Sequence, residues 1–420
     1  MFECNRRTGY LFNFHRLAEG IAGLNLILKS LPRLVAFLFP IFLMATIYAV
    51  PTAAVTLRVG PERQLKSPSA AAQVAHSGDI IEIDTGVYLN DYAIWDQDNL
   101  TIRGADGGMA HLQSEGLIPN KKAIWIINGN NTVIENVEFS GARVKDGNGA
   151  GIRLQGGDLT LRNLFFHDNE FSVLTGKLPD SSVEIDSSRF WFQKRKNTFS
   201  HGIYIGAIER FTLTGSHVKG TDRGHQIKTR ALENHILYNR IEDTPRGNSS
   251  RLIDLPNCGL SFVIGNDLHQ AQSTQNVDAI GYGAEKCGQR SELQKRLYVI
   301  NNTFINEAWR GTLVKNHAAG DVLVVNNQIV GRGYFLLGPG TKINNARIGL
   351  TADEPRTWMP LPESEAIDGA AELSERDSKS LVPSREFKSP AGTAERILVG
   401  DLDIGSRELQ YPLEEAPAQD

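Results

Sequence analysis

The fold is decided by a short pattern, Ile134-Glu135-Asn136 and then Leu161-Arg162-Asn163, in which an apolar residue stands two places before an asparagine. The pattern recurs, with serine in two copies, at Ser188, Ser216, Asn239, Asn266, Asn302 and Asn327. The positions of successive copies differ by 27, 25, 28, 23, 27, 36 and 25, so one unit repeats with a single insertion between Asn266 and Asn302. Unrelated turns would not recur so regularly, and self-similarity at this period indicates stacked repeats.

The residues within each unit are typical of β-strands. Stretches such as Thr132 to Ile134, Phe211 to Leu213 and Val322 to Val325 alternate with turns of glycine, asparagine and aspartate. Units this short cannot bury an apolar face alone, but they can do so when they stack into a solenoid. The repeated asparagine suits a tight bend, because asparagine tolerates the left-handed backbone region and its amide can bond to the asparagine of the next coil.

Composition supports one repeat rather than several globular domains. A chain of 420 residues predicts two or three domains, but 40 glycines against 17 prolines, with 8% aromatic residues, favour a turn-rich chain over a helical bundle. Hydrophobic residues at 41% exclude global disorder.

The formal net charge of -4 is unevenly distributed. Residues 1–54 hold five basic and two acidic residues, and residues 351–420 hold seven and sixteen. The middle therefore carries 32 basic and 30 acidic residues, which is too close to neutral for a nucleic-acid partner.

The N-terminal segment, residues 1–54, predicts export. Leu34 to Val50 is a continuous apolar run, broken only by Pro40 and Thr46, and five basic residues precede it. The small residues Thr52, Ala53 and Ala54 suit cleavage after Ala54. An uncleaved membrane anchor stays open, since the run is at the lower limit for spanning a bilayer. The mature protein is expected to be periplasmic, extracellular or membrane-anchored, and its oligomeric state stays open.

The start and end of the exported part resemble the pectate-lyase-like superfamily of right-handed parallel β-helices. The start combines Leu57 to Pro61, an Ala-rich segment Ser69 to Ala75, and Ser77 to Tyr88, and the end contains Asp401 to Glu408. The resemblance implies an all-β solenoid over residues 55–350, capped by an N-terminal helix that covers the open strand row. Residues 351–420 are expected to be an irregular acidic tail.

One face of four adjacent coils gathers most of the candidate functional residues. Strands aligned on Ile203, Ile227, Ile253 and Ile280 place the following residue of each outward, because side chains alternate along a strand. That outward column is Tyr204, Lys228, Asp254 and Gly281, and Arg230 stands two residues beyond Lys228. A second column is His201, His225, Arg251 and Asp278. Strand parity alone would turn it inward, but at the corner that opens a strand it could point either way.

These residue types suit proton abstraction beside a carboxylate, which is what the resemblance to polysaccharide lyases and C5-epimerases implies. We expect Lys228 to act as the base, with His201 or His225 as the acid or second base. Arg230 and Arg251 would hold a uronate carboxylate in bidentate fashion. Tyr204, Asp254 and Asp278 would complete the binding surface. The alternative to a functional site is a solvated face with ordinary stacked ion pairs, in which Lys228 pairs with Asp254 and Arg251 with Asp278.

No cofactor is required by this set of residues. Arginine can neutralise the substrate carboxylate, and Asp254 and Asp278 are too few for a calcium ion, which prefers six to eight oxygens. Calcium nevertheless stays open, and the sequence assigns no metal ligand.

Cys258 and Cys287 follow their register isoleucines by five and seven residues, so they lie at nearly the same place on adjacent coils and predict a disulfide.

Two functions of different classes follow. The first is an enzyme acting on an acidic polysaccharide, as a lyase or C5-epimerase. Hydrolysis ranks lower, because it needs converging carboxylates and the face is richer in cations. The second is a non-catalytic envelope protein that binds glycan, since solenoid surfaces also serve binding alone.

Overall fold

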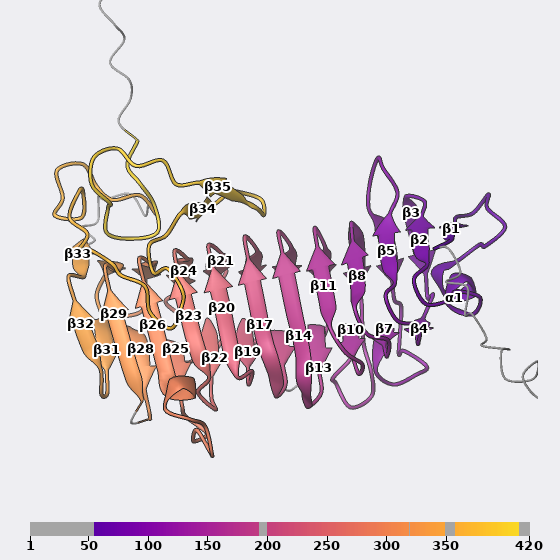
Figure 1. The fold of residues 1–420 in the computed structure, drawn as a ribbon, viewed down its shortest axis with the longest axis horizontal. Coiled ribbons are helices and arrows are strands. Elements are labelled where there is room, and N and C mark those ends of the chain that lie inside the picture. Colours follow the sequence, from indigo (N-terminus) through magenta and orange to yellow (C-terminus); the bar gives the residue numbers. More distant parts are fainter. Residues whose placement is uncertain (1–53, 193–199, 319, 349–357, 411–420) are drawn as a thin grey trace, which may run out of the picture. The chain divides into compact units, whose positions relative to one another are not determined.

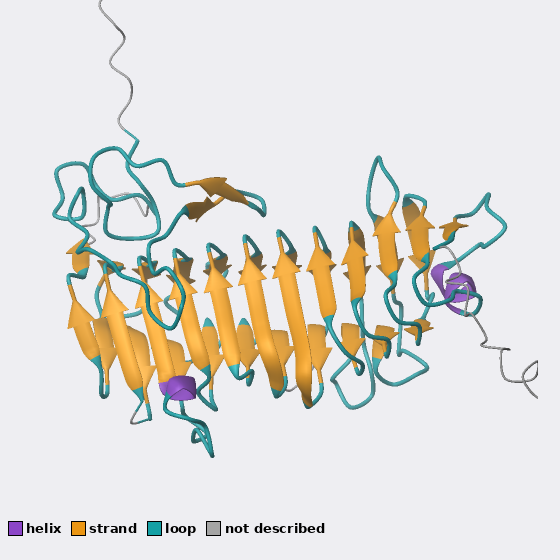
Figure 2. Cartoon of the chain, viewed as in Figure 1, coloured by secondary structure: helices purple, strands orange, loops and turns teal. Residues whose placement is uncertain are grey.

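The protein, available as a computed structural model, is described over residues 54–192, 200–318, 320–348 and 358–410. Its strands form three long parallel sheets in which hydrogen-bonded neighbours are mostly three strands apart in the chain, so most coils contribute one strand to each sheet. Figure 1 shows these strands following one another along the solenoid, and Figure 2 shows how little helix accompanies them. The repeat predicted a stacked solenoid, and the fold is the right-handed parallel β-helix that the resemblance to the pectate-lyase-like superfamily implied.

Sheet A has twelve strands. They are β1 (Thr56–Val59), β2 (Ile80–Ile83), β5 (Thr101–Gly104), β8 (Thr132–Glu135), β11 (Leu159–Arg162), β14 (Leu178–Asp186), β17 (Ile208–Thr214), β20 (Glu233–Leu237), β23 (Leu260–Ile264), β26 (Arg296–Ile300), β29 (Asp321–Val325) and β32 (Thr341–Ile343).

Sheet B has eleven strands. They are β3 (Gly86–Leu89), β6 (Ala110–Gln113), β9 (Val137–Ser140), β12 (Phe165–His167), β15 (Arg189–Trp191), β18 (His217–Lys219), β21 (Arg240–Glu242), β24 (Asp267–Gln270), β27 (Thr303–Asn306), β30 (Gln328–Gly331) and β33 (Ala346–Ile348).

Sheet C has ten strands. They are β4 (Ala93–Trp95), β7 (Ala123–Ile127), β10 (Ala150–Leu154), β13 (Phe171–Thr175), β16 (His201–Ile205), β19 (Ile227–Thr229), β22 (Ile253–Leu255), β25 (Asp278–Tyr282), β28 (Thr312–Asn316) and β31 (Tyr334–Leu337).

The bend from sheet A to sheet B uses two consecutive positions. The first takes the left-handed backbone conformation, and Asn136 and Asn163 occupy it with φ of 57° and 50°. In the later coils Tyr238, Gly265 or Asn301 stands there instead, and the repeated asparagine follows it. The prediction that one position serves both the bend and the ladder is right for the two earliest copies, because the Asn163 amide also donates to the Asn136 amide oxygen at 3.2 Å. For the later asparagines it is wrong by one residue.

In the later coils the second position forms the predicted ladder. The amide nitrogen of each buried asparagine donates to the amide oxygen of the asparagine one coil later, at 2.9–3.0 Å. We call this row the asparagine corner; it consists of Asn239, Asn266, Asn302, Asn327 and Asn345. A buried amide is costly unless hydrogen-bonded, so the row fixes the stacking of the coils.

Inward side chains form one continuous core from Val59 to Leu336. Phe139, Phe166 and Phe190 stack face to face along it, with ring centroids 5.1 Å apart at each step. Aligned rings recur because successive coils place equivalent residues at the strand spacing.

Helix α1 (Pro68–Ala72) covers the N-terminal end of this core, with Ala71 and Ala72 buried in it. The hydroxyl of Ser67 accepts the Ala70 N–H at 3.4 Å and begins the helix. The helix is shorter than the predicted Ser69 to Ala75 segment and starts one residue earlier. The predicted leader lies outside the described residues, except for Ala54. No helix in the described ranges has the length and apolarity to cross a membrane.

Residues 358–410 are irregular apart from a hairpin of β34 (Arg385–Phe387) and β35 (Thr393–Glu395). They pack along the coils through specific contacts. Asp377 accepts bonds from Arg296 and Tyr298 at 2.5 and 2.7 Å, and the Asn301 amide donates to the Asp403 carbonyl at 2.9 Å. The expected irregular tail therefore has defined contacts with sheet A and its bends, although residues 351–357 and 411–420 lie outside the described part.

Candidate functional site

The outward column of sheet C has the register expected from the sequence. Tyr204 on β16 pairs with Lys228 on β19, Lys228 with Asp254 on β22, and Asp254 with Gly281 on β25. The same column continues to Lys315 on β28. Four neighbouring coils thus present a phenol, an ammonium, a carboxylate and a bare backbone position on one face.

Asp254 is the buried centre of the charged cluster. Its carboxylate contacts Lys228 Nζ at 3.2 Å, Arg251 Nη1 at 2.9 Å and His225 Nε2 at 3.4 Å, and only 2% of its side chain is exposed. Gly281 makes this possible, because a Cβ there would lie 2.6 Å from Arg251 Nε. The alternative of ordinary ion pairs predicted two of them. The pair of Lys228 with Asp254 is present, but Arg251 pairs with Asp254 instead of Asp278.

His201 and His225 lie on the same outward face as Lys228. Their rings stack with centroids 5.1 Å apart and planes 9° apart, and the His201 ring is 5.6 Å from the Tyr204 ring. Each Nδ1 faces a backbone N–H of the next coil: His201 accepts from His225 at 3.0 Å and His225 from Arg251 at 3.2 Å. Both histidines therefore point outward, against strand parity, as their place at the corner that opens the strand allowed.

This geometry argues against His201 or His225 as acid or second base. Burial is the main reason why the pKa of His201 falls to about 3, and the neighbouring His225 and Lys228 add to the shift. Burial and the charges of Lys228 and Arg251 lower the pKa of His225 to about 3. Both rings are neutral near pH 7, with Nδ1 accepting a backbone N–H and the proton on Nε2, so neither has a free lone pair. Each ring accepts a backbone N–H of the next coil, and His225 also contacts Asp254.

Glu285 joins the cluster from a loop and was missed by the sequence analysis. Its carboxylate bridges two cations, with Lys228 Nζ at 3.0 Å and Arg230 Nη1 at 2.7 Å. The hydrogen bond from Arg230 is the main reason why the pKa of Glu285 falls to about 2, and Lys228 adds to it. The face is therefore less cationic than the strand residues alone predicted.

The loop that carries Glu285 is the insertion seen in the repeat spacing. It follows β25, contains the short helix η1 (Leu293–Lys295) and leads into β26. Cys287 forms a disulfide with Cys258 of the preceding coil, with Cα atoms 5.1 Å apart, and the Glu285 N–H donates to the Pro256 carbonyl at 2.8 Å. The long spacing and the cysteine two residues after Glu285 are the signals that could have pointed to this loop.

Arg230 is held at the edge of the cluster. Its Nε donates to the Tyr204 hydroxyl at 3.1 Å, and its Nη1 also donates to Asn257. Arg290, from the same loop as Glu285, donates to the Arg230 carbonyl at 2.9 Å. Arg230, Asn257 and Arg290 line an open cavity of about 380 Å³. The two arginines in its lining make this cavity suited to an anion.

The remaining candidates lie at the ends of the face. Asp278 begins β25 and pairs in register with Thr312, one coil beyond Arg251.

Asp254 is surrounded by cations and Glu285 is bound by two, so this cluster does not offer the free oxygens that calcium needs. Calcium in this cluster would have to displace Lys228 or an arginine.

Comparison with known proteins identifies the fold. No family model matches the chain, and no curated protein does. Among solved structures, pectate lyase Pel9A is 14% identical, with a TM-score of 0.59, covering 85% of this chain and 98% of its own. An alginate lyase from Paenibacillus sp. str. FPU-7 is 16% identical, with a TM-score of 0.48, covering 70% and 98%. The chain thus has the parallel β-helix fold of pectate-lyase-like proteins.

Proposed function

We propose that the protein is exported and acts on an acidic polysaccharide, removing the proton next to a uronate carboxylate as a lyase or C5-epimerase. One observation carries this proposal. The Glu285 carboxylate bridges Lys228 and Arg230, so these two cations are spaced to bind a single carboxylate. Support of a weaker kind comes from the fold, which is similar to that of a protein described as a pectate lyase.

The substrate carboxylate would bind at Arg230. In the described part of the chain, the hydrogen bonds of this guanidinium use Nε and Nη1, which leaves Nη2 for a ligand. Arg290 and Asn257 line the adjoining cavity, and Arg251, fixed by Asp254, adds positive charge on the next coil. Neutralising the carboxylate makes the α-proton more acidic, which is the first requirement of the reaction.

Lys228 would take that proton, and Tyr204 would supply one. In elimination the C5 proton passes to Lys228 Nζ, the electron pair forms the C4–C5 double bond, and the C4–O bond breaks. The leaving oxygen takes a proton from Tyr204, whose hydroxyl oxygen already accepts from Arg230. In epimerisation the proton returns to C5 from the opposite face. Lys228 must first leave the Glu285 carboxylate and lose a proton to solvent, because only the neutral amine can accept the C5 proton. Substrate binding at Arg230 favours the departure from Glu285 by competition.

The second candidate is a non-catalytic glycan-binding protein. The observation that favours it is the double ion pair of Lys228, whose ammonium lies between Asp254 and Glu285 at 3.2 and 3.0 Å. An ammonium held in this way binds an anion without abstracting a proton.

The deciding experiment incubates the full-length chain with alginate, pectate, glucuronan and glycosaminoglycans. Ultraviolet absorbance reports the unsaturated product of elimination, and deuterium exchange at C5 reports epimerisation. We expect Lys228→Ala to abolish turnover and Glu285→Gln to tighten binding, since the competing carboxylate is removed. Lys315→Ala is the matched control, because Lys315 stands in the same outward column but outside the cluster.

Three outcomes separate the candidates. Turnover that is lost in Lys228→Ala and kept in Lys315→Ala supports the enzyme. Binding without product or exchange, again lost in Lys228→Ala, supports the glycan-binding protein. If Lys228→Ala and Arg230→Ala alter neither binding nor turnover, this face of sheet C is not the functional site.

A further inference from the structure

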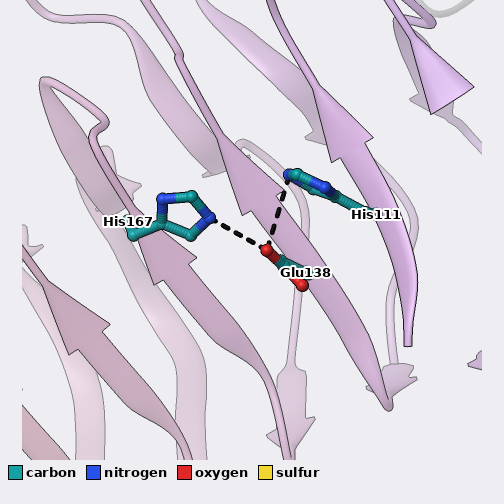
Figure 3. A group of neighbouring side chains, drawn as sticks. All are labelled: His111, Glu138 and His167. Carbon is teal, nitrogen blue, oxygen red and sulfur yellow. Dashed lines mark hydrogen bonds and ion pairs between the residues drawn. The ribbon is translucent and has the colours of Figure 1, made fainter. Parts of the chain in front are cut away.

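A second cluster of chemistry-bearing side chains lies on sheet B, on three successive coils. His111 on β6, Glu138 on β9 and His167 on β12 offer one nitrogen or oxygen each, and these atoms all lie within 4.8 Å of one another. Figure 3 shows the two imidazole rings on either side of the Glu138 carboxylate, with a nitrogen of each ring directed at it. This is a different sheet from the one that carries Lys228, so the cluster is separate from the proposed polysaccharide site.

The distances within the cluster are close to those around a metal ion. Glu138 Oε1 lies 2.9 Å from His167 Nε2 and 3.6 Å from His111 Nε2. Ligand atoms on a tetrahedral zinc ion lie about 3.3 Å apart, given bonds of about 2.0–2.1 Å. Small rotations of the three side chains would bring them to that spacing, and the Ser140 hydroxyl, now 2.7 Å from His111 Nε2, would have to yield.

The outer contacts also have the arrangement found around metal-binding histidines. His167 Nδ1 is 2.7 Å from an Asp168 carboxylate oxygen, which accepts its proton and leaves Nε2 directed at the cluster. A carboxylate on the far nitrogen of a metal-binding histidine fixes the ring and raises its basicity. An isolated histidine–glutamate ion pair needs neither a second histidine nor this outer carboxylate.

We propose that His111, Glu138 and His167 bind a divalent transition-metal ion of the zinc type. Two imidazole nitrogens and one carboxylate suit zinc and its neighbours, whereas calcium prefers six to eight oxygens. The three side chains are 20–23% exposed, so a fourth position on the ion would face solvent and hold water. The site stands independently of the proposed polysaccharide chemistry.

The test uses the full-length chain stripped with a chelator and titrated with Zn²⁺ against a chromophoric competitor. We expect one tight equivalent, a visible Co²⁺ spectrum of tetrahedral intensity, and a rise in Tm with Zn²⁺ but not with Ca²⁺. His111→Gln, Glu138→Gln and His167→Gln should each weaken Zn²⁺ binding at least about 100-fold. Asp168→Asn, which removes only the outer contact, should weaken it about 10–100-fold.

The matched control is His217→Gln. His217 on β18 lies in the same sheet and pairs with Glu242 at 2.8 Å, so it is a simple histidine–glutamate pair. Binding should be unchanged in this variant. The proposal is overturned if the wild-type chain takes up no Zn²⁺, or if the variants at positions 111, 138 and 167 bind it as the wild type does. Circular dichroism of each variant identifies any loss of binding caused by unfolding.

Discussion

The asparagine corner and the charged face of sheet C differ in what neighbouring coils repeat. At the corner, successive coils place the same side chain at the same position, and each amide bonds to the next at 2.9–3.0 Å. On the charged face, successive coils place Tyr204, Lys228, Asp254 and Gly281 in register, and none repeats its neighbour.

The contrast separates what fixes the fold from what the proposed function uses. A repeated residue makes the same contact in every coil, so its energy adds along the solenoid and fixes the stacking. A residue that departs from the repeat gains nothing from stacking and needs partners of its own. On the charged face these partners include a residue outside the strands, Glu285, on a loop tied back by the disulfide. Variants that break one region at a time should therefore have different effects.

The largest loss of stability should come from a substitution in the asparagine corner. Asn266→Ala removes the acceptor of the Asn239 N–H and amide, and also the donor to the Ile236 carbonyl. Each buried polar group without a partner costs about 1–3 kcal/mol, so we expect unfolding to become easier by about 4 kcal/mol. Urea denaturation followed by circular dichroism measures the change.

Asn163→Gly is the control for that variant. Asn163 is an exposed member of the same bends and has φ of 50°, which glycine adopts without strain. Its loss should change the free energy of unfolding by less than about 1 kcal/mol. Equal effects of the two variants would mean that burial does not distinguish the corner from ordinary turns.

The same contrast explains how far the sequence could be interpreted. The strands, the register of Tyr204 on Lys228 and the amide ladder follow from periodicity, because stacking converts a repeat in the sequence into a contact in space. The neutrality of His201 and His225 could not be predicted, because it depends mainly on how deeply the stacked coils bury the two rings.

Two groups of side chains used in the proposals were not predicted from the sequence, for different reasons. Glu285 lies on an insertion, and no repeat indicates where a loop side chain will reach. His111, Glu138 and His167 escaped although they carried a signal, since each follows the one before it by the length of one coil. A search for metal-binding residues at coil-length spacing, rather than at the short spacing of zinc motifs, would have found them.

The second prediction separates the loop from the strands. Cys287→Ala opens a cross-link between cysteines whose sequence separation is 29 and should lower the free energy of unfolding by about 3 kcal/mol. It should also weaken the Glu285 contacts with Lys228 and Arg230, and so alter glycan binding while strand content by circular dichroism stays unchanged.

Reductant provides the control for that variant. It should lower the urea midpoint of the wild type to that of Cys287→Ala and leave the variant unaffected. The denatured, unreduced full-length chain should titrate one thiol of its three cysteines, belonging to Cys4. A titre of three thiols would show that the cross-link does not form.

The third prediction concerns acid. The pKa values of His201 and His225 are about 3 in the folded protein and about 6.5 in an unfolded chain, so between these values the unfolded chain binds more protons. Stability is therefore lost as the pH falls from 6.5 towards 3, by up to about 1.4 kcal/mol per pH unit for each histidine. His225→Gln should flatten this slope, and His76→Gln, at an exposed side chain, should not. Urea midpoints at pH 7, 6 and 5 measure it, and an unchanged slope in His225→Gln would contradict the buried neutral ring.

The smallest effect on stability should come from an exposed ion pair. It joins adjacent coils as the pairs of the charged face do, but it is not buried. Arg162 Nη1 lies 3.0 Å from Glu135 Oε1 on adjacent strands of sheet A, but the side chains are 48% and 32% exposed. A double-mutant cycle of Arg162→Ala and Glu135→Gln should give a coupling below about 0.5 kcal/mol that vanishes in high salt. Stacked coils align opposite charges wherever the sequence provides them, so alignment alone does not make a site. A coupling well above the range of ordinary exposed ion pairs would mean that pairing between coils is strong without burial. The ion pairs of the charged face would then not differ from other pairs between coils.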